Sequence, residues 1–278
     1  QDEVYVYGSF VQSRMYHGGV RCTDCHDPHK VTLLVSGNDL CVRCHQDFPL
    51  PQFPTLKPGV FDDKYHHFHE PGTPGAQCVN CHMADRVYMG IDARRDHSFR
   101  VPRPDLSVAL GTPNACNQCH QDKDAAWAAD AVEQWYGPRE RPKHFATAIA
   151  GGRRGDAAAE GDLVALTKDE TVPALVRATA MELLQNYGGA AASEALLAGL
   201  KDPSPLVRAQ AVGGMDRLPL GVRGEVLGPL VMDTMASVRI GAARLLAGAP
   251  GLSEEIAAGL TTATAEYTAL QLATGEQT

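Results

Sequence analysis

Four short motifs combine two cysteines and a histidine at one spacing: CTDCH at 22–26, CVRCH at 41–45, CVNCH at 78–82 and CNQCH at 116–120. Each reads C-x-x-C-H, the attachment pattern of c-type haem. The two thiols bond to the two vinyl groups of one porphyrin, and the histidine that follows binds the iron. The sequence therefore predicts four haem c groups, attached at Cys22, Cys25, Cys41, Cys44, Cys78, Cys81, Cys116 and Cys119, with His26, His45, His82 and His120 as proximal iron ligands.

The number of cysteines supports this interpretation. The chain has 8 cysteines, and the four motifs use all of them, so none is left for a disulfide or a catalytic thiol. The alternative is a pair of zinc ribbons, each with four cysteine ligands. A zinc ribbon has no use for a histidine directly after every second cysteine, so the haem interpretation is favoured.

Each iron also has a distal position, and of the 11 histidines seven lie outside the motifs. A neutral imidazole is a common sixth ligand and gives a six-coordinate iron of low potential. His17 and His29 flank the first motif and are the predicted distal ligands of the first haem pair. In the cluster before the third motif we prefer His66 or His69, and His97 is a further predicted ligand. The alternative for each is an exposed loop histidine.

Other residues near the motifs leave more than one interpretation open. Arginines at 94, 95, 100 and 103 surround His97. They either pair with haem propionates, since a guanidinium fork matches a carboxylate, or form a solvated basic loop. His144 is either buried and neutral, close to a propionate, or a ligand of an iron in a neighbouring subunit. Met83 directly follows His82 along the same turn and is not predicted as a ligand.

The first 120 residues lack the long periodic apolar runs from which a side-chain core is built. They are rich in Pro, Gly and His, and the first two motifs begin only 19 residues apart. This favours an irregular module that is packed around haem. Residues 1–16 are predicted to form an edge strand or an arm. After the fourth motif, Trp127, Ala131 and Trp135 have helical spacing up to Gly137, which predicts a helix that packs on the fourth haem and the next domain.

From about residue 156 the composition changes to Ala, Leu, Val and Gly, and a 31-residue repeat begins. Val-Arg pairs mark it at 176–177, 207–208 and 238–239, within apolar segments of helical spacing. Such a period indicates stacked helix pairs. We predict a mainly α fold with two domains, a tetrahaem module at 1–125 and a HEAT-like α-solenoid at 126–278. The repeat arginines are predicted to pair with aspartates between repeats, and ligand contacts are the alternative.

Four stretches resemble a known family: CTDCHDPHK, HHFHEPGTPGAQCVNCHM, ARRDHSFRVPRPDLS and LGTPNACNQCHQDK. They are similar to the multihaem c-type cytochromes with doubled C-x-x-C-H motifs, in which a tetrahaem module precedes HEAT-type or tetratricopeptide-type repeats. The resemblance covers about residues 15–185. It implies bis-histidine haems and electron transfer outside the cytoplasm. Because such proteins commonly continue into tetratricopeptide repeats, the chain is expected to be a short member or a processed form.

The formal net charge of −8 becomes more negative once haem propionates are added. This argues against nucleic acid or an anionic membrane as partner. No apolar run reaches the roughly 20 residues of a membrane span. Since covalent haem is attached outside the cytoplasm, we expect that a secretion signal preceding Gln1 has been removed and that the protein is periplasmic or extracellular.

The predicted function is electron transfer rather than catalysis, with the helical repeats as a docking or assembly surface for redox partners such as other cytochromes. The alternative is self-association, head to tail, into an extracellular cytochrome filament. In that case His144 or a histidine of the 66–69 cluster crosses the subunit boundary. A multihaem reductase ranks last, because it needs an iron with an open position or a lysine ligand, and the sequence contains no C-x-x-C-K motif.

Overall fold

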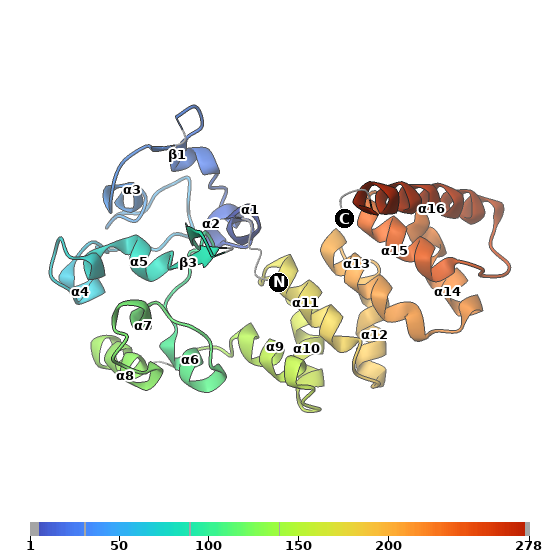
Figure 1. The fold of residues 1–278 in the computed structure, drawn as a ribbon. Helices are drawn as coiled ribbons and strands as arrows, with labels where there is room; N and C mark the ends of the chain where they lie inside the picture. Colours follow the sequence, from blue (N-terminus) through green and yellow to red (C-terminus); the bar gives the residue numbers. More distant parts are fainter. Residues whose placement is uncertain (1–5, 31, 89, 139, 276–278) are drawn as a thin grey trace. The chain divides into compact units, whose positions relative to one another are not determined.

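The computed structural model describes residues 6–30, 32–88, 90–138 and 140–275. The chain is mainly helical, as predicted, and it divides into two compact units, Gln1–Arg141 and Pro142–Thr278 (Figure 1). The division follows helix α8 (Ala125–Tyr136), whereas the boundary predicted at residue 125 precedes it. Helix α8 belongs to the first unit because it packs on α6 (Pro104–Leu110) and α7 (Cys116–Cys119).

Short helices and two small hairpins, joined by irregular segments, make up the first unit. Ser13 caps α2 by accepting a hydrogen bond from the backbone N–H of Tyr16 at 3.1 Å. Residues 6–16 form helical turns, so the edge strand, one of the two forms predicted for residues 1–16, is wrong there, and residues 1–5 lie outside the described ranges. The Ser13 cap favours the second of these turns. The other helices of this unit are α1 (Val6–Phe10), α2 (Arg14–His17), α3 (Asp39–Val42), α4 (Lys64–His67) and α5 (Cys78–His82), with 3-10 turns η1 (Cys22–Asp24) and η2 (Pro74–Ala76). The antiparallel strand pairs are β1 (His26–Asp27) with β2 (Thr32–Leu33) and β3 (Asp85–Tyr88) with β4 (Asp92–Arg95).

Few hydrophobic side chains of the first unit are buried. Among its described residues these are Phe10, Ala76 and Ala128. Three small or isolated side chains do not make a hydrophobic core for a unit of this size. Contacts between side chains alone therefore do not account for how the irregular segments of the first unit are held.

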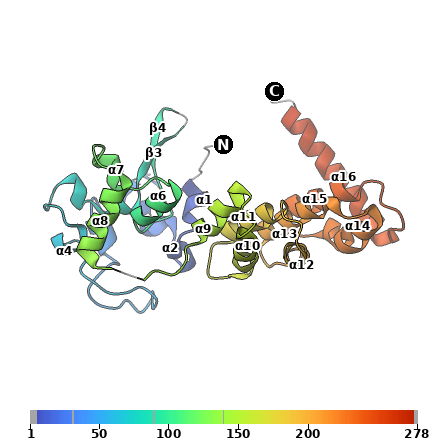
Figure 2. The same cartoon turned by 90° about the horizontal axis from the view of Figure 1, so that it is seen from below.

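The second unit is built from consecutive helices (Figure 2). Their buried side chains form one continuous core. Helix α11 packs on α9, α10 and α13, α13 packs on α15, and α15 packs on α16. The three repeat segments found in the sequence form α11, α13 and α15. The helices of this unit are α9 (Phe145–Arg154), α10 (Ala159–Lys168), α11 (Ala174–Leu184), α12 (Ala190–Gly199), α13 (Pro205–Gly213), α14 (Leu220–Leu227), α15 (Ala236–Leu246) and α16 (Glu254–Gly275), with 3-10 turns η3 (Gly214–Arg217) and η4 (Gly228–Met232).

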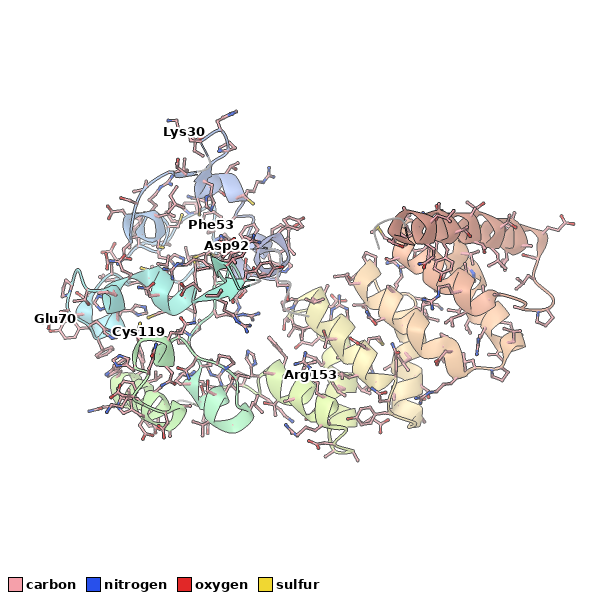
Figure 3. The ribbon with its side chains drawn as sticks, viewed as in Figure 1. Lys30, Phe53, Glu70, Asp92, Cys119 and Arg153 are labelled. Carbon is pink, nitrogen blue, oxygen red and sulfur yellow. The ribbon has the colours of Figure 1, made fainter. Side chains whose placement is uncertain are left out.

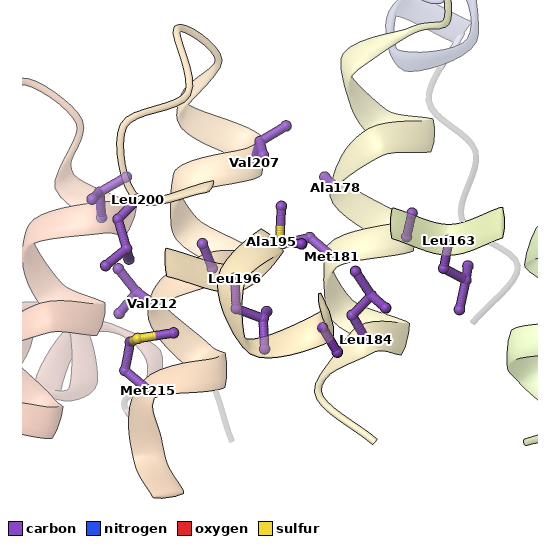
Figure 4. Packing of buried hydrophobic residues seen from close by; sticks show 14 of the residues in the cluster. Leu163, Ala178, Met181, Leu184, Ala195, Leu196, Leu200, Val207, Val212 and Met215 are labelled. Carbon is purple, nitrogen blue, oxygen red and sulfur yellow. The ribbon is translucent and has the colours of Figure 1, made fainter. Parts of the chain in front are cut away.

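The core of the second unit comes from one face of each helix. Leu163 of α10, Met181 and Leu184 of α11 and Val207 of α13 are almost fully buried (Figure 4). Burial of one such side chain contributes about 2 kcal/mol relative to exposure in water. A Cβ atom at Gly199 would lie 2.6 Å from Cε of Met181, so the absence of a side chain lets α12 approach α11 closely.

Ion pairs connect successive repeats at a regular spacing. Arg208 binds Asp233 through two hydrogen bonds, Nε to Oδ2 at 2.7 Å and Nη2 to Oδ1 at 2.9 Å. Both side chains are largely buried. The prediction that repeat arginines pair with aspartates between repeats is confirmed for Arg177 and Arg208, whereas Arg239 pairs with Glu266 of α16. The pairs are Arg177 with Asp202, Arg208 with Asp233 and Arg239 with Glu266.

Within the described ranges, no helix has the length and apolar character needed to cross a membrane.

Candidate haem-binding sites

All eight cysteines are free thiols, and each motif lies on or beside a short helical turn. Residues three positions apart on a helical turn face the same side, so the two thiols of each motif can reach one porphyrin edge. Cys22 and Cys119 are exposed, and the six cysteines between them in the sequence are half-buried. Figure 3 labels Cys119 at the end of α7.

Three motif histidines face three of the predicted distal histidines. The ring centroids are 6.3 Å apart for His26 and His97, 6.1 Å for His66 and His82, and 6.1 Å for His69 and His120. A bond from a metal to an imidazole nitrogen is about 2 Å long, so two imidazoles on opposite sides of one ion have centroids about 6 Å apart. These three pairs therefore have the separation that two axial ligands of one iron require.

Hydrogen bonds at Nδ1 determine which ring nitrogen of these histidines is available to a metal. His82 Nδ1 lies 2.8 Å from the carbonyl oxygen of Arg100, and His97 Nδ1 lies 2.9 Å from that of Arg95. His69 Nδ1 lies 2.5 Å from the carbonyl oxygen of His67. A carbonyl oxygen only accepts, so each Nδ1 carries the proton and Nε2 keeps its lone pair. Metal-ligating histidines are commonly held in this way.

His66 has the same arrangement with a hydroxyl in place of a carbonyl. The hydroxyl of Tyr136 donates to the carbonyl oxygen of His66, and it lies 3.5 Å from Nδ1 of the same residue. The hydroxyl oxygen is thus the acceptor for the Nδ1 proton. No sequence pattern indicates the role of Tyr136, because its contact with His66 spans 70 residues of chain.

Two other histidines have the opposite tautomer. Nδ1 of His67 accepts a hydrogen bond from the backbone N–H of His69 at 3.2 Å, and Nδ1 of His144 accepts one from Ala146 at 3.1 Å. In the neutral form each then carries its proton on Nε2, which leaves no lone pair there for iron. His144 is half-buried and caps α9. The Nδ1 atoms of His67 and His144 serve the local backbone instead.

Within the described residues, no histidine ring faces that of His45 in the second motif. The ring of His45 contacts that of Phe61, with centroids 5.9 Å apart. His17 is in ring contact with Tyr16, and His29 lies in the turn that joins β1 to β2. Both His17 and His29 are exposed. In the described part of the chain neither is in ring contact with a motif histidine, so their ligand role stays a prediction.

Burial keeps part of the site uncharged. It lowers the pKa of His45 and of His66, and the nearby His82 lowers both further. A neutral imidazole is the form that binds a metal. The interaction with the Cys78 side chain, together with burial, raises the pKa of Cys41, and the interaction with Cys41 lowers the pKa of Cys78 although burial opposes this. Burial also raises the pKa of Cys81, and the charges of the fourth-motif cysteines add to this effect.

Helix α8 places aromatic side chains against the fourth motif. The Trp127 ring lies 4.8 Å from that of His120, and Trp135 stacks on Phe68 at 4.6 Å with an interplanar angle of 3°. The helix predicted for this segment is confirmed. Its start is fixed by Asp124, whose side chain accepts a hydrogen bond from the backbone N–H of Trp127 at 2.8 Å.

The arginines near His97 have partners within the protein. Arg94 pairs with Asp92 at 2.7 Å, and Arg103 pairs with Asp105. This second pair lowers the pKa of Asp105, mainly through the hydrogen bonds from Arg103. Arg95 donates to two backbone carbonyl oxygens at the third motif. The prediction that these arginines bind propionates remains untested.

Residues 16–49 match a family model described as the doubled CXXCH motif. The matched segment contains the first two motifs and the β1–β2 hairpin. This is a feature of multihaem c-type cytochromes, and it indicates covalently bound haem c with iron and a role in electron transfer. A comparison with curated proteins found no match.

Proposed function

We propose that the chain binds four haem c groups and transfers electrons between partners outside the cytoplasm. The observation that carries this proposal is the set of three histidine pairs, His26 with His97, His82 with His66, and His120 with His69. Their centroid separations of 6.1 to 6.3 Å fit two axial ligands of one iron. Haem supplies a one-electron iron couple, and its covalent attachment takes place outside the cytoplasm.

The residues of the chain would hold the first, third and fourth haems in three ways. The cysteines tether the porphyrin edge, the motif histidine binds from one side, and the facing histidine binds from the other. Nδ1 hydrogen bonds to Arg100, Arg95, His67 and Tyr136 keep the rings oriented toward iron. With both axial positions filled by imidazole, no position is left for substrate, which favours an electron carrier over a reductase.

His45 needs a distal ligand from the remaining histidines. His67 and His144 are disfavoured by their tautomers. His17 and His29 are exposed on short turns, and we assign the second iron to one of these two. Spectra of His17→Ala and His29→Ala separate the alternatives, since only one variant is expected to convert one haem from low spin to high spin.

Haem content and spin state test the function directly. The protein is isolated from a host that attaches haem c, and its haem is counted by the pyridine haemochrome assay and by mass. We expect four haems per chain, all low-spin when ferric, and unaffected by nitrite or cyanide. A high-spin haem that binds either anion would instead support the reductase.

The second unit is proposed to be a HEAT-like solenoid that docks redox partners. The repeated helices α11, α13 and α15 and the ion pairs between repeats support this assignment. Each repeat covers its neighbour, which is the arrangement that gives solenoids an extended binding surface.

A cytochrome filament is the second candidate, favoured by the exposure of His17 and His29. An exposed histidine next to a motif can reach an iron in the next subunit as well as one in its own chain. Electron microscopy of the protein from its native source distinguishes the two functions. Long filaments with a regular subunit repeat would establish the polymer, and monodisperse particles would favour the discrete carrier.

A further inference from the structure

We propose that the four C-x-x-C-H sites form one unbranched series in chain order, with exposed ends at Cys22 and at Cys119. This inference rests on the proposed binding of four haems. It assigns the two ends of the series as the places where electrons enter and leave, and the second and third sites as internal steps.

Hydrogen bonds connect the first site to the second and the second to the third. Arg43 in the second motif donates from Nη1 to the carbonyl oxygen of Asp24 in the first motif, at 3.4 Å. Asn38, just before α3, accepts from the backbone N–H of Cys78 at 2.9 Å and donates to the carbonyl oxygen of Ala76 at 2.9 Å. The Cys41 and Cys78 side chains are also close enough to shift the pKa of each other. Porphyrin edges attached at these two cysteines would therefore be close neighbours.

The third site is connected to the fourth in a similar way. Gln118, inside the fourth motif, donates from Nε2 to the carbonyl oxygen of Asp85 at 3.0 Å, and Asp85 begins β3 directly after the third motif. The facing histidines of these two sites, His66 and His69, also come from one short segment at the end of α4. Successive motifs are thus in contact along the whole series.

The exposure of the cysteines agrees with this order of the sites. Cys22, the first cysteine of the first motif, and Cys119, the last cysteine of the fourth, are exposed, while the six between them are half-buried. A porphyrin tethered at an exposed thiol has an edge near the protein surface. A series with both ends at the surface and its middle covered lets electrons pass through the unit from one partner to another.

The segment from Arg95 to His97 makes contacts that favour a different order of the sites, with the first next to the third. Arg95 donates from Nη1 to the carbonyl oxygens of Val79 and Met83 at the third motif, and His97, two residues later, faces His26 of the first. The backbone of this segment therefore lies between the first and third sites, so the porphyrins attached at these two sites would not have their edges in contact. We therefore take the first site as the neighbour of the second, and the experiment below includes the rival order.

Two axial substitutions at opposite ends test the order. Methionine in place of an axial histidine raises the reduction potential of that haem, so it accepts the first electron. That electron then lowers the potentials of the other haems, most strongly for the nearest one, because the Coulomb interaction falls with distance. For His120→Met we expect the reduction potential to fall most at the third site, less at the second and least at the first. For His26→Met we expect the reduction potential to fall most at the second site, less at the third and least at the fourth.

Haem-methyl NMR signals followed through a redox titration give these rankings. If His26→Met affects the third site most, the proposed order is wrong. His97→Met and His69→Met alter the same two irons from the opposite side, and they replace the first pair if either variant loses haem. Fewer than four haems in the wild-type protein would overturn the proposed function itself, whereas four haems with another ranking would overturn only the series.

Charge substitutions test the two ends. Thr23→Glu next to Cys22 and Gln121→Glu near Cys119 are compared with Thr55→Glu, a matched exposed position between the second and third motifs. At low ionic strength we expect oxidation of the reduced protein by ferricyanide to slow about threefold for each end variant, through local anion repulsion, and to be unchanged for Thr55→Glu. Equal effects of all three substitutions would contradict electron exit at the ends.

Discussion

The hydrogen bond at one ring nitrogen separates the candidate iron ligands from the other histidines. In His69 and His97 the Nδ1–H donates a hydrogen bond to a backbone carbonyl oxygen, which leaves Nε2 free to bind a metal. In His67 and His144 a backbone N–H occupies Nδ1 instead. All four side chains are chemically alike, so their different roles come from the backbone around them.

The ring of His69 occupies space that is free only because residue 75 is a glycine. A Cβ atom there would lie 2.2 Å from Cδ2 of His69. We expect Gly75→Ala to displace the ring from His120 and to convert one low-spin ferric haem to high spin, as measured by electron paramagnetic resonance. The control is Gly8→Ala, whose new Cβ atom would have no neighbour within 4 Å. A fully low-spin spectrum for Gly75→Ala would show that His69 is not a ligand.

At the scale of the elements, short helical turns carry the cysteines and longer helices position what surrounds them. Helix α8 begins at the Asp124 cap and brings Trp127 to His120 and Trp135 to Phe68. The cap, the helix and the aromatic contacts are therefore coupled. A substitution at the start of α8 is therefore expected to alter the surroundings of His120 at the fourth candidate haem site.

Asp124→Ala tests this coupling. Loss of the N-cap is expected to destabilise the first unit by about 1 kcal/mol and to lower the temperature at which the fourth site loses its low-spin spectrum. Asp130→Ala makes the same change on an exposed position of the same helix and is expected to have little effect. Equal losses in both variants would mean that the cap is not what positions α8.

The ion pair between Arg208 and Asp233 predicts a pH dependence of stability in the second unit. The hydrogen bonds from Arg208 hold the pKa of Asp233 below its usual value. The folded state therefore gains stability that is fully present above the unfolded pKa of about 4 and is lost as pH falls through the lower folded pKa. Asp233→Asn removes this gain.

We expect Asp233→Asn to lower the free energy of unfolding by about 2 kcal/mol at neutral pH, measured by denaturant titration with circular dichroism. The difference from wild type should shrink below about pH 4. Asp156→Asn, at the exposed Arg154–Asp156 pair, should cost about 0.5 kcal/mol or less. A pH-independent loss for Asp233→Asn would refute the linkage.

At the scale of the whole molecule, each of the two units is stabilised in a different way. The second unit has a continuous hydrophobic core that runs through successive helices. Among the described residues of the first unit, the buried hydrophobic side chains are Phe10, Ala76 and Ala128. Bound haem would supply the apolar surface that this unit does not obtain from its own side chains.

A protein without haem attachment tests this difference. With all eight cysteines changed to alanine, we expect limited proteolysis to digest the first unit and to leave a resistant helical fragment that begins near Pro142. Its identity is read by mass spectrometry and its helicity by circular dichroism. Equal resistance of both units would show that the first unit folds without the cofactor.

The candidate attachment motifs and the repeats of the second unit could be predicted from local sequence patterns. Both are local patterns: C-x-x-C-H is a covalent requirement within five residues, and the Val-Arg repeat follows from helix geometry. The edge strand considered for residues 1–16, by contrast, is replaced over residues 6–16 by helical turns, the second of which is capped by Ser13. The facing of His26 with His97 and of His120 with His69, and the division of the units after α8, became visible only in the folded chain. These features depend on contacts between residues far apart in the chain and on the position of backbone carbonyls, which no spacing in the sequence encodes.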